Sequence, residues 1–437
     1  MKTYDGISQF MGSHYLEAVE WRRILHRCPQ PAWLEFYATG FIAEKLAAWG
    51  YQVLQGRDII APGRHLLPPG QDTLEAEYQR AIKAGARERF VAPAKGGFTG
   101  VVGILEGSSP GPTVAFRFDI DSNEVVESQD PSHRPAAEGF ISQNPGYAHM
   151  CGHDAHISTG LLLARYLAEN RDKIKGRVKF LFQPNEENLS GALAMVDKGL
   201  LDDVDFLFGA HVGLNLTATG EIGIDVQNFL ALTRFEVTYT GRASHAAVRP
   251  NEGKNALLGA CAAVSNLYAI ARHGAGPSRV NVGVFNAGTT WNVIPDRAYF
   301  RLETRGATNE INNYMVEKAH QVLEGAAKMY DLGLEVKPAA NSLSGRNSPE
   351  MIELATGVAG SLPGAKVVRQ VDFGGSEDVT VMMERVQSRG GQTLFAVLGT
   401  PTHGGHHSAS FDLDEKVIQV GAEFFAAMYD AVTNKTP

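Results

Sequence analysis

The chain has 437 residues, of which 44% are hydrophobic and 20% are charged, an ordinary globular composition with room for two or three domains. Its formal net charge of −8 argues against broad electrostatic binding to nucleic acid or to an anionic membrane. No apolar stretch is long enough to span a membrane, and the N-terminus lacks the apolar core of a signal peptide. Only three cysteines occur, far apart in sequence, so we expect no disulfide framework and a cytoplasmic location.

Hydrophobic periodicity predicts the elements of the first half of the chain. Apolar residues recur at helical spacing between Ser8 and Gln55, which predicts helices there. Residues 57–90 are polar, punctuated by Pro and Gly, and then charged and helical, so we expect an insertion on the surface. Strands and helices then alternate, which is typical of a mostly parallel sheet covered by helices on both faces. The expected elements are strands at 100–107 and 113–121, a helix at 156–170, a strand at 177–183, a helix near Ser190 and a strand at 206–211.

A different pattern runs from about Leu230 to about Asn341. It reads as a strand, a helix, two strands, a long helix and a last strand, which is the split βαββαβ order of a ferredoxin-like domain. The αβ alternation then resumes to the end of the chain. The sequence therefore predicts a discontinuous α/β domain with a mixed sheet, residues 1–228 and 342–437, and a smaller inserted α+β domain, residues 229–341.

The run HMCGHD, residues 149–154, carries the strongest chemical signal. Cys151 and His153 lie on either side of a glycine, just before a helical run, so a tight turn could aim a thiolate and an imidazole at one ion. The alternative is a buried cysteine and a structural histidine. Three histidines and a cysteine within eight residues weaken that alternative.

Two adjacent carboxylates, Glu186 and Glu187, directly follow a predicted strand in the run QPNEE. Open α/β folds build their sites at the carboxyl ends of strands. One glutamate can bind a metal while its neighbour acts as a general base toward water. A solvated acidic turn is the alternative, and it is the better interpretation of this run taken alone.

Two further histidine signals are weaker. His211 ends a predicted strand, where a structural histidine is the commoner finding. His406 and His407 lie in the Gly-rich run THGGHHS, whose glycines permit a tight backbone near a ligand or ion, although a solvated loop is equally expected. Four separate His, Cys and Glu clusters at such positions are hard to attribute to coincidence, so we expect a metal site.

Together with longer runs, these residues resemble a known family. The order CGHD, QPNEE, a strand-end histidine, SHAAVRPNEGKNAL and NVIPDRAYFRLETR is similar, over nearly the whole chain, to the hippurate hydrolase and auxin-conjugate hydrolase branch of the aminoacylase/carboxypeptidase metallopeptidases. The resemblance implies a metal-dependent enzyme that cleaves the amide bond of an N-acyl amino acid. It favours an aromatic acyl group on glutamate or aspartate, as in p-aminobenzoyl-glutamate or indole-3-acetyl-aspartate. Other N-acyl amino acids are the alternative.

The resemblance also implies roles for residues of the α/β domain. Glu186 would be the general base, and Asp119 would orient a ligand histidine. Two manganese or zinc ions per chain would be bound by Cys151 as the bridge and by His153, Glu187, His211 and His407. We prefer His407 to His406 as the last ligand because of its spacing to Phe411.

For the inserted domain, the resemblance implies a lid and a dimerisation surface. His245 would reach the active site of a partner copy and help to stabilise the tetrahedral oxyanion. Asn292 and Arg305 would hold the carboxylate of the substrate. Without the resemblance, Asn292 is a turn residue before Pro295, and Arg305 is a solvated strand end. We therefore expect a homodimer, or a heteromer with a homologous chain, that acts on a small-molecule N-acyl amino acid.

The sequence departs from the family pattern beside the expected base. Asn185 stands where alanine is usual, and Ala409 lies in the stretch where a proline usually follows the last ligand histidine. These departures leave the ligand residues intact and bear on the acyl specificity. Two other classes stay open: a metal-binding scaffold paired with a catalytic homologue, and a non-catalytic carboxylate-binding protein.

Overall fold

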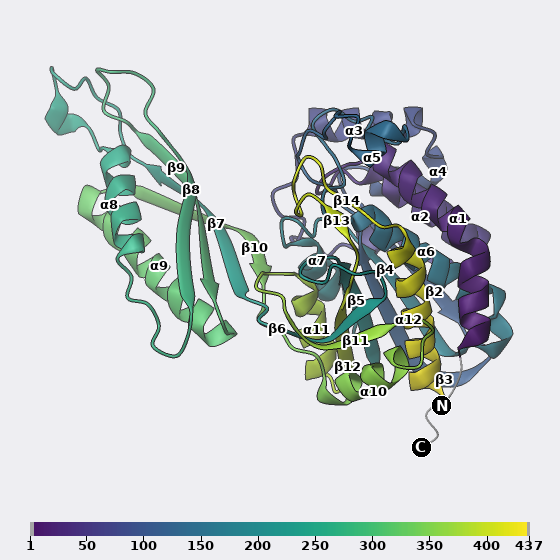
Figure 1. Ribbon diagram of the computed structural model, residues 1–437. Coiled ribbons are helices and arrows are strands. Elements are labelled where there is room, and N and C mark those ends of the chain that lie inside the picture. The colour runs from purple at the N-terminus through teal and green to yellow at the C-terminus, as the bar shows by residue number, and fades with distance from the viewer. Residues whose placement is uncertain (1–3, 435–437) are drawn as a thin grey trace. The chain divides into compact units, whose positions relative to one another are not determined.

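The structure, a computed structural model, describes residues 4–434, which divide into two compact units (Figure 1). The first unit runs to Gln227 and also contains Arg346–Phe373 and the chain from Asp378 onward. The second unit consists of Asn228–Gly345 and Gly374–Glu377. Two short pieces that the sequence places in the α/β domain, 342–345 and 374–377, therefore group with the second unit.

The first unit is an α/β unit with a mixed sheet, as the sequence predicts. Its strands are β1 (Gln52–Gln55), β2 (Val101–Glu106), β3 (Ser109–Asp119), β4 (Lys175–Gln183), β5 (Phe206–Val212), β6 (Glu221–Gln227), β11 (Lys366–Asp372), β12 (Gln392–Leu398), β13 (Thr402–His403) and β14 (Asp412–Leu413). Eight of them form one sheet in the order β1-β2-β4-β3-β5-β12-β6-β11. The central neighbours β4, β3, β5 and β12 run parallel, whereas β1, β2 and β6 each make an antiparallel pairing.

Helices cover both faces of this sheet. They are α1 (Asp5–Arg27), α2 (Phe36–Ala48), α3 (Gln71–Lys83), α4 (Glu88–Val91), α5 (Arg134–Ala137), α6 (His153–Glu169), α7 (Gly191–Asp197), α10 (Pro349–Ala359), α11 (Val379–Ser388) and α12 (Lys416–Thr433). Helices α1, α6 and α12 pack against one another, and α7 packs against α11.

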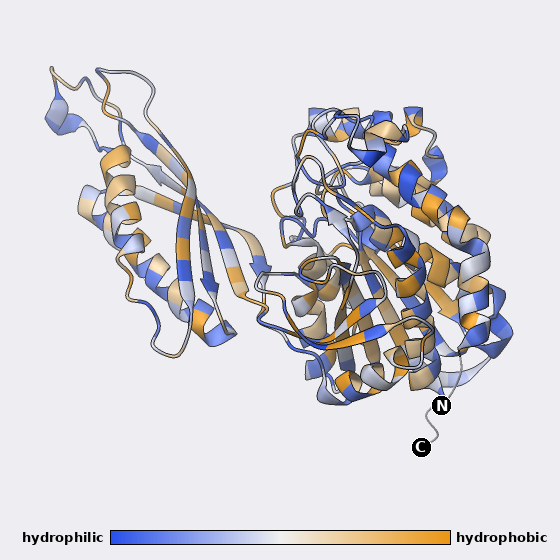
Figure 2. Cartoon of the chain, in the orientation of Figure 1, coloured by the Kyte–Doolittle hydropathy of each residue, from blue (hydrophilic) through white to orange (hydrophobic). Residues whose placement is uncertain are grey.

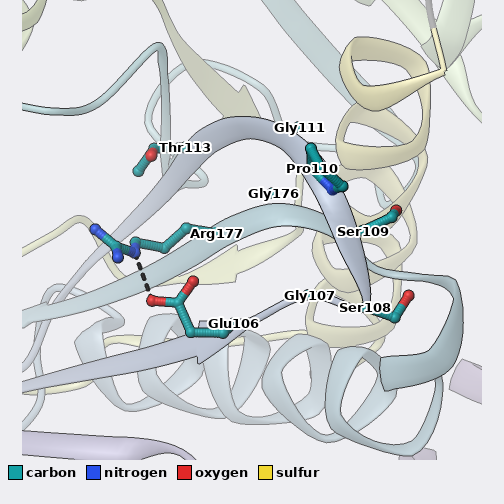
Figure 3. Close-up of a pocket in the computed structure, with 9 residues that line it drawn as sticks. All are labelled: Glu106, Gly107, Ser108, Ser109, Pro110, Gly111, Thr113, Gly176 and Arg177. Atoms are coloured by element: carbon teal, nitrogen blue, oxygen red, sulfur yellow. Dashed lines mark hydrogen bonds and ion pairs between the residues drawn. The ribbon is translucent and has the colours of Figure 1, made fainter.

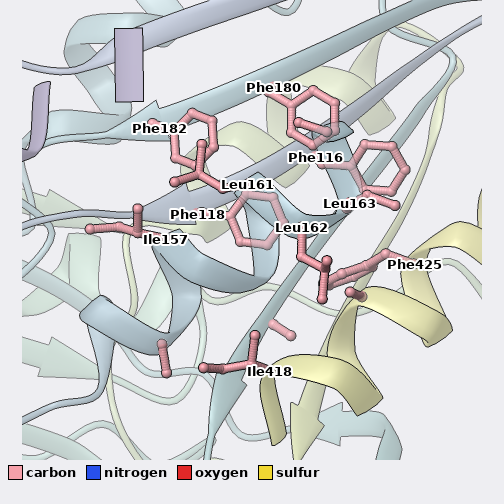
Figure 4. Close-up of a cluster of buried hydrophobic side chains, with 14 of the residues drawn as sticks. Phe116, Phe118, Ile157, Leu161, Leu162, Leu163, Phe180, Phe182, Ile418 and Phe425 are labelled. Carbon is pink, nitrogen blue, oxygen red and sulfur yellow. The ribbon is translucent and has the colours of Figure 1, made fainter. Parts of the chain in front are cut away.

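The core lies between the central strands and helices α6 and α12 (Figure 4). Phe116 and Phe118 are two residues apart on β3, so both side chains point to the same face of the sheet. There they contact Phe180, Phe182 and Phe425. All five rings are buried. Because burial of one such side chain contributes roughly 1.5–3 kcal/mol, this aromatic layer anchors the strands whose ends carry the site. Figure 2 shows the same pattern, with hydrophobic residues along the interior strands of the first unit.

The prediction that residues 57–90 form a surface insertion is only partly correct. Helix α3 exposes most of its charged residues, but Leu74, Tyr78 and Ala81 are buried in the main core. The ring of Tyr78 meets that of Phe36 edge to face at 5.7 Å between centroids. One face of the insertion is therefore part of the folded core.

The second unit has the element order β7 (Ala231–Thr240), α8 (Ala256–Tyr268), β8 (Ser278–Ala287), β9 (Arg297–Gly306), α9 (Asn309–Tyr330) and β10 (Gly333–Ser342). Its four strands form an antiparallel sheet in the order β10-β7-β9-β8. This is the βαββαβ order that the sequence predicts. Helices α8 and α9 pack on the sheet around a core of its own.

Within residues 4–434, none of the helices combines the length and the apolar character that crossing a membrane requires.

Candidate metal centre

The candidate site forms where the central parallel strands end. Asp119, the last residue of β3, pairs in register with Gln183, the last residue of β4. His211 and Val212 are the last two residues of β5, which runs parallel to β3. Because parallel strands end at the same edge of a sheet, side chains far apart in sequence meet there.

Helix α6 begins at His153, three residues before the predicted start. Its N-cap Gly152 has φ +92°, and a Cβ atom there would lie 2.6 Å from Val212 Cγ2, so a side chain would be strained and would clash. This turn lets Cys151 and His153 approach the end of β5. The earlier start also places His156 one turn along the helix from His153.

Cys151 is shared by two groups of potential ligand atoms. The donor atoms of Cys151, His153 and Glu187 lie within 4.8 Å of one another, and so do those of Cys151, His211 and His406. His407 lies beside the first group, with its Nε2 atom 3.3 Å from Glu187 Oε2. Three of the five predicted ligands, His153, Glu187 and His211, therefore lie around the thiol of a fourth, Cys151, and the fifth, His407, is in contact with Glu187.

Hydrogen bonds to carbonyl oxygens leave one lone pair on each of two buried imidazoles. His153 Nδ1 donates to Asp121 O at 2.9 Å, and its Nε2 atom is buried without a hydrogen bond among the described residues. His211 Nδ1 donates to Val212 O at 2.8 Å, while its Nε2 atom lies 3.4 Å from Cys151 Sγ. Metal-binding histidines commonly show this pairing of one donated N–H with one free nitrogen.

His156 has no such free nitrogen, although it lies with Asp119 and His153 in a third cluster. Its Nδ1 atom lies 2.5 Å from Asp119 Oδ1, and its Nε2 atom accepts from Val212 N at 3.0 Å. Both ring nitrogens are thus used within the protein. We interpret this third cluster as a hydrogen-bonded support of the site. The sequence predicts that Asp119 orients a ligand histidine, but its closest histidine is His156, which is not a predicted ligand. Asp119 Oδ1 lies 3.8 Å from Nε2 of the predicted ligand His153.

The electrostatics of the site favour cations. Burial opposes charge on His153, but the carboxylate of Asp119 and the hydrogen bond to Asp121 raise its pKa well above the usual value. Burial and the neighbouring His156 lower the pKa of His211 well below its usual value, which keeps this imidazole neutral. Burial raises the pKa of the Cys151 thiol, so a nearby positive charge is needed to stabilise the thiolate. A divalent ion would take the place of the proton that the neighbouring carboxylates favour on His153. A thiolate, imidazoles and a carboxylate match the donors of zinc and similar divalent ions, so the residues fit such ions.

The turn that carries the two glutamates is held from several sides. Glu187 accepts from Asn123 Nδ2 at 2.7 Å, and its backbone N–H donates to Asp121 Oδ2 at 3.0 Å. Asn185 has φ +53°, and its backbone N–H donates to the buried carboxylate of Glu35 at 2.8 Å. Glu186 lies between these two anchored residues and is itself buried.

Sequence reasoning missed four supporting residues: Glu35, Asp121, Asn123 and His156. Only His156 had a usable signal, because it follows His153 at the helical spacing of three residues. The others meet the site through tertiary contacts that no local pattern encodes.

The remaining predicted residues lie in the second unit. His245 and Asn292 occupy neighbouring segments, in which Ala246 N donates to Asn292 O at 2.9 Å. Arg305, near the end of β9, forms an ion pair with Glu303 at 2.9 Å.

The first unit also has a cavity of about 490 Å³ at the opposite edge of the sheet, where β3 and β4 begin (Figure 3). It contains the ion pair of Arg177 with Glu106 at 2.7 Å, and no histidine or cysteine lines it. Because the potential metal ligands lie at the carboxyl edge of the sheet, we assign the candidate site to that edge.

Comparison with known proteins agrees with this geometry. The sequence pattern of Peptidase family M20/M25/M40 matches residues 115–431. The chain is 40% identical over 424 residues to one of the subunits of the p-aminobenzoyl-glutamate hydrolase of Escherichia coli, covering 97% of each chain. It is 42% identical over 412 residues to the indole-3-acetyl-aspartic acid hydrolase of Enterobacter agglomerans, covering 94% of each.

Two solved structures are also similar to this chain in fold and in sequence. The aminobenzoyl-glutamate utilization protein of Klebsiella pneumoniae superposes with a TM-score of 0.85 at 34% identity, covering 99% of this chain and 100% of that one. A dinuclear metal binding peptidase of the M20 family from Bacillus subtilis superposes with a TM-score of 0.68 at 25% identity, covering 97% and 100%. The chain therefore belongs to peptidase family M20/M25/M40 and is a metal-dependent amide hydrolase, as the sequence predicts.

Proposed function

We propose that the chain hydrolyses the amide bond between an aromatic acyl group and glutamate or aspartate, using two manganese or zinc ions held around Cys151. The observation that carries the proposal is the pair of donor groups that share this thiol beside the turn with Glu186. The substrate class is supported by relatives at 40% and 42% identity that are named for p-aminobenzoyl-glutamate and indole-3-acetyl-aspartic acid.

Residues of the first unit bind the metal ions and transfer the proton. When bound, the ions supply Lewis acidity to the amide carbonyl and favour ionisation of a water molecule. Glu186 takes the proton from that water and returns it to the leaving amine. The proposed ion-binding residues are Cys151, His153, Glu187, His211 and His407.

The second unit contributes substrate recognition. Arg305 uses two N–H groups on Glu303, at 2.9 and 3.4 Å, and a guanidinium has five, so donors remain for the carboxylate of the amino acid. Asn292 assists this grip. His245, supplied by the partner in a homodimer, stabilises the oxyanion of the tetrahedral intermediate.

The Glu186→Gln variant tests the catalytic assignment. We expect kcat to fall by roughly 10²- to 10⁴-fold, because an amide cannot accept the proton, while metal content stays unchanged. Glu20→Gln, which changes an exposed glutamate of α1, is the matched control. An unchanged kcat in Glu186→Gln would reject the role of general base.

The substrate proposal is tested by comparing kcat/KM for p-aminobenzoyl-glutamate, indole-3-acetyl-aspartate and an N-acetylated neutral amino acid. We expect one of the two aromatic conjugates to be the best substrate. Preference for the N-acetylated neutral amino acid would overturn the substrate class.

The assay uses the purified chain alone, supplied with manganese. The relative from Escherichia coli is named as one subunit of its enzyme. Activity of this chain without a partner would therefore decide against a heteromer that needs a second, homologous chain.

The three cysteines are free, which suits a reducing compartment such as the cytoplasm.

A further inference from the structure

His406 and His407 are adjacent in sequence and both lie near Cys151, but their other neighbours differ. His406 shares a donor group with Cys151 and His211, whose ligand atoms lie within 4.8 Å of one another. His407 also contacts Cys151, and its Nε2 atom lies 3.3 Å from Glu187 Oε2. The backbone of His407 has φ +65°, a left-handed turn that separates the directions of the two side chains.

The hydrogen bonds of His406 leave one nitrogen available. Its Nε2 atom lies 3.2 Å from Val212 O, and a carbonyl oxygen only accepts, so Nε2 carries the proton. Nδ1 of the neutral ring therefore keeps its lone pair. His211 donates to the same carbonyl oxygen at 2.8 Å through its own Nδ1. One backbone carbonyl thus fixes the tautomers of both imidazoles, as it does for many metal ligands.

Packing holds the His406 ring in this place. Its centroid lies 4.8 Å from the ring of Phe411 and 5.3 Å from the ring of His211. Gly213 has φ +71°, and a Cβ atom there would lie 3.1 Å from His406 Cε1, so the glycine allows the ring its close approach to β5.

We propose that His406 is a metal ligand, which completes a site of Cys151, His211 and His406 for one divalent ion. Cys151, His153 and Glu187, with His407 beside them, form the site of the other ion. His406 lies outside the ligand set that the family resemblance implies. The proposal rests on the proposed function, because both require ions bound at Cys151.

Metal binding, measured separately from activity, tests the proposal. Purified protein is stripped with a chelator and titrated with Co²⁺, and bound cobalt is followed by elemental analysis and by the thiolate-to-cobalt charge-transfer band. We expect two ions per chain in the wild type. His406→Leu should keep one ion and bind the second at least ~10-fold more weakly, whereas His407→Leu should leave the ion at His211 in place.

Double variants identify which ion is lost. If His406 and His211 hold the same ion, the double variant His211→Leu/His406→Leu still binds one ion, whereas His211→Leu/His407→Leu is weakened at both sites. His406→Gln provides a second test if the leucine variant misfolds, because the amide can still donate to Val212 O.

Each other result contradicts the proposal in a different way. Two ions bound with wild-type affinity by His406→Leu would overturn the role of His406 alone. Loss of the ion at His211 in His407→Leu, with His406→Leu unaffected, would assign the position to His407. Absence of bound ions in the wild type would overturn both this proposal and the proposed function.

Discussion

At the scale of single residues, Glu35 lies beneath the turn that carries the proposed base. Its carboxyl group is fully buried; one oxygen accepts from Asn185 N at 2.8 Å, and the other lies 2.5 Å from Thr99 Oγ1. Burial, together with the nearby Asp121, raises the pKa of Glu35 to about 8, so the carboxyl is largely protonated at neutral pH. The side chain therefore acts as a neutral acceptor that holds the turn in place.

We predict that Glu35→Met lowers kcat by up to about 100-fold with little change in KM, because the released Asn185 N–H lets Glu186 shift. Glu35→Gln, which resembles the protonated acid, should keep most of the activity. Steady-state kinetics at saturating metal measure both values. Thr99→Val is the control, because it removes the other hydrogen bond of Glu35 and leaves the one to Asn185. A wild-type kcat in Glu35→Met would contradict this role.

How far single residues could be predicted depends on how local their contacts are. Cys151 and His153 are close in sequence and flank a glycine, so their proximity follows from the local pattern. His211 and Glu187 could be expected nearby because they lie at or just after the ends of two parallel strands of one sheet. Glu35 could not, because it is 150 residues from Asn185 and its contact depends on how α2 packs.

At the scale of elements, a buried charge cluster ties α1 to the start of α6. Arg22 Nε donates to Asp154 Oδ2 at 3.0 Å, and His26 Nδ1 lies 2.7 Å from the same oxygen. His26 Nε2 contacts Glu127 Oε1 at 2.9 Å. Since Asp154 directly follows His153, this cluster positions the helix start that bears a proposed ligand.

The charge on His26 makes the stability of the fold depend on pH. Burial opposes protonation, but hydrogen bonds to Asp154 and Glu127 raise the pKa of His26 from 6.5 to about 9. Because the pKa of His26 is higher in the folded than in the unfolded protein, protonated His26 stabilises the fold fully below pH 6.5. This contribution is lost as the pH rises through about 9. The contribution is on the order of 3 kcal/mol at most.

We predict that the stability difference between wild type and His26→Gln shrinks as the pH rises from 6 to 9. Urea unfolding of the chelator-treated proteins at several pH values measures it. His14→Gln, a change at a partly buried histidine of the same helix, is the control. A difference that stays constant across this range would mean that His26 is not charged in the folded protein.

The elements themselves were predictable where periodicity was strong. Strands β4 and β5 begin or end within two residues of the predicted limits, because apolar runs mark buried parallel strands. Helix α6 starts earlier than predicted, because its first turn is polar in sequence yet buried by the site. Helix α3 was taken as surface because charged residues dominate it, although its apolar stripe packs in the core.

At the scale of the whole molecule, the sequence predicts that a second domain interrupts the α/β domain. The alternation of strands and helices gives way to a βαββαβ pattern near residue 230 and resumes near residue 342. The sequence could not show that 374–377 groups with the second unit, because a four-residue loop has no periodicity. The family is confirmed by the comparisons. The lid and dimerisation roles of the inserted domain are proposals that need a partner to test.

The proposed homodimer needs a surface that a second copy of the chain can bind, and the sheet of the second unit has an exposed edge. Strand β8 lies at one edge of that sheet, so β9 is its only strand partner among residues 4–434. Val284 and Phe285 on this strand are 38% and 40% exposed, and Leu258 and Tyr268 on α8 are each 46% exposed. An exposed apolar edge strand invites pairing with another edge, and pairing of two β8 strands would form a symmetric dimer.

If the protein is the proposed dimer, we predict that wild type sediments as a dimer and Val284→Lys as a monomer in sedimentation velocity, because a charge on the edge disfavours strand pairing. Leu16→Lys, at an apolar residue of α1 that is 78% exposed, is the control and should stay dimeric. A dimeric Val284→Lys protein would place the interface elsewhere.

Complementation then tests whether His245 acts across the dimer. His245→Ala and Glu186→Gln are each expected to be inactive as homodimers. If His245 serves the partner's site, a mixed dimer contains one site with both residues intact, so mixing the two variants restores part of the activity. If His245 serves its own protomer, every site in the mixture lacks one residue and no activity returns. Adding Val284→Lys to both variants should abolish the restored activity, because protomers that cannot pair cannot exchange their histidines.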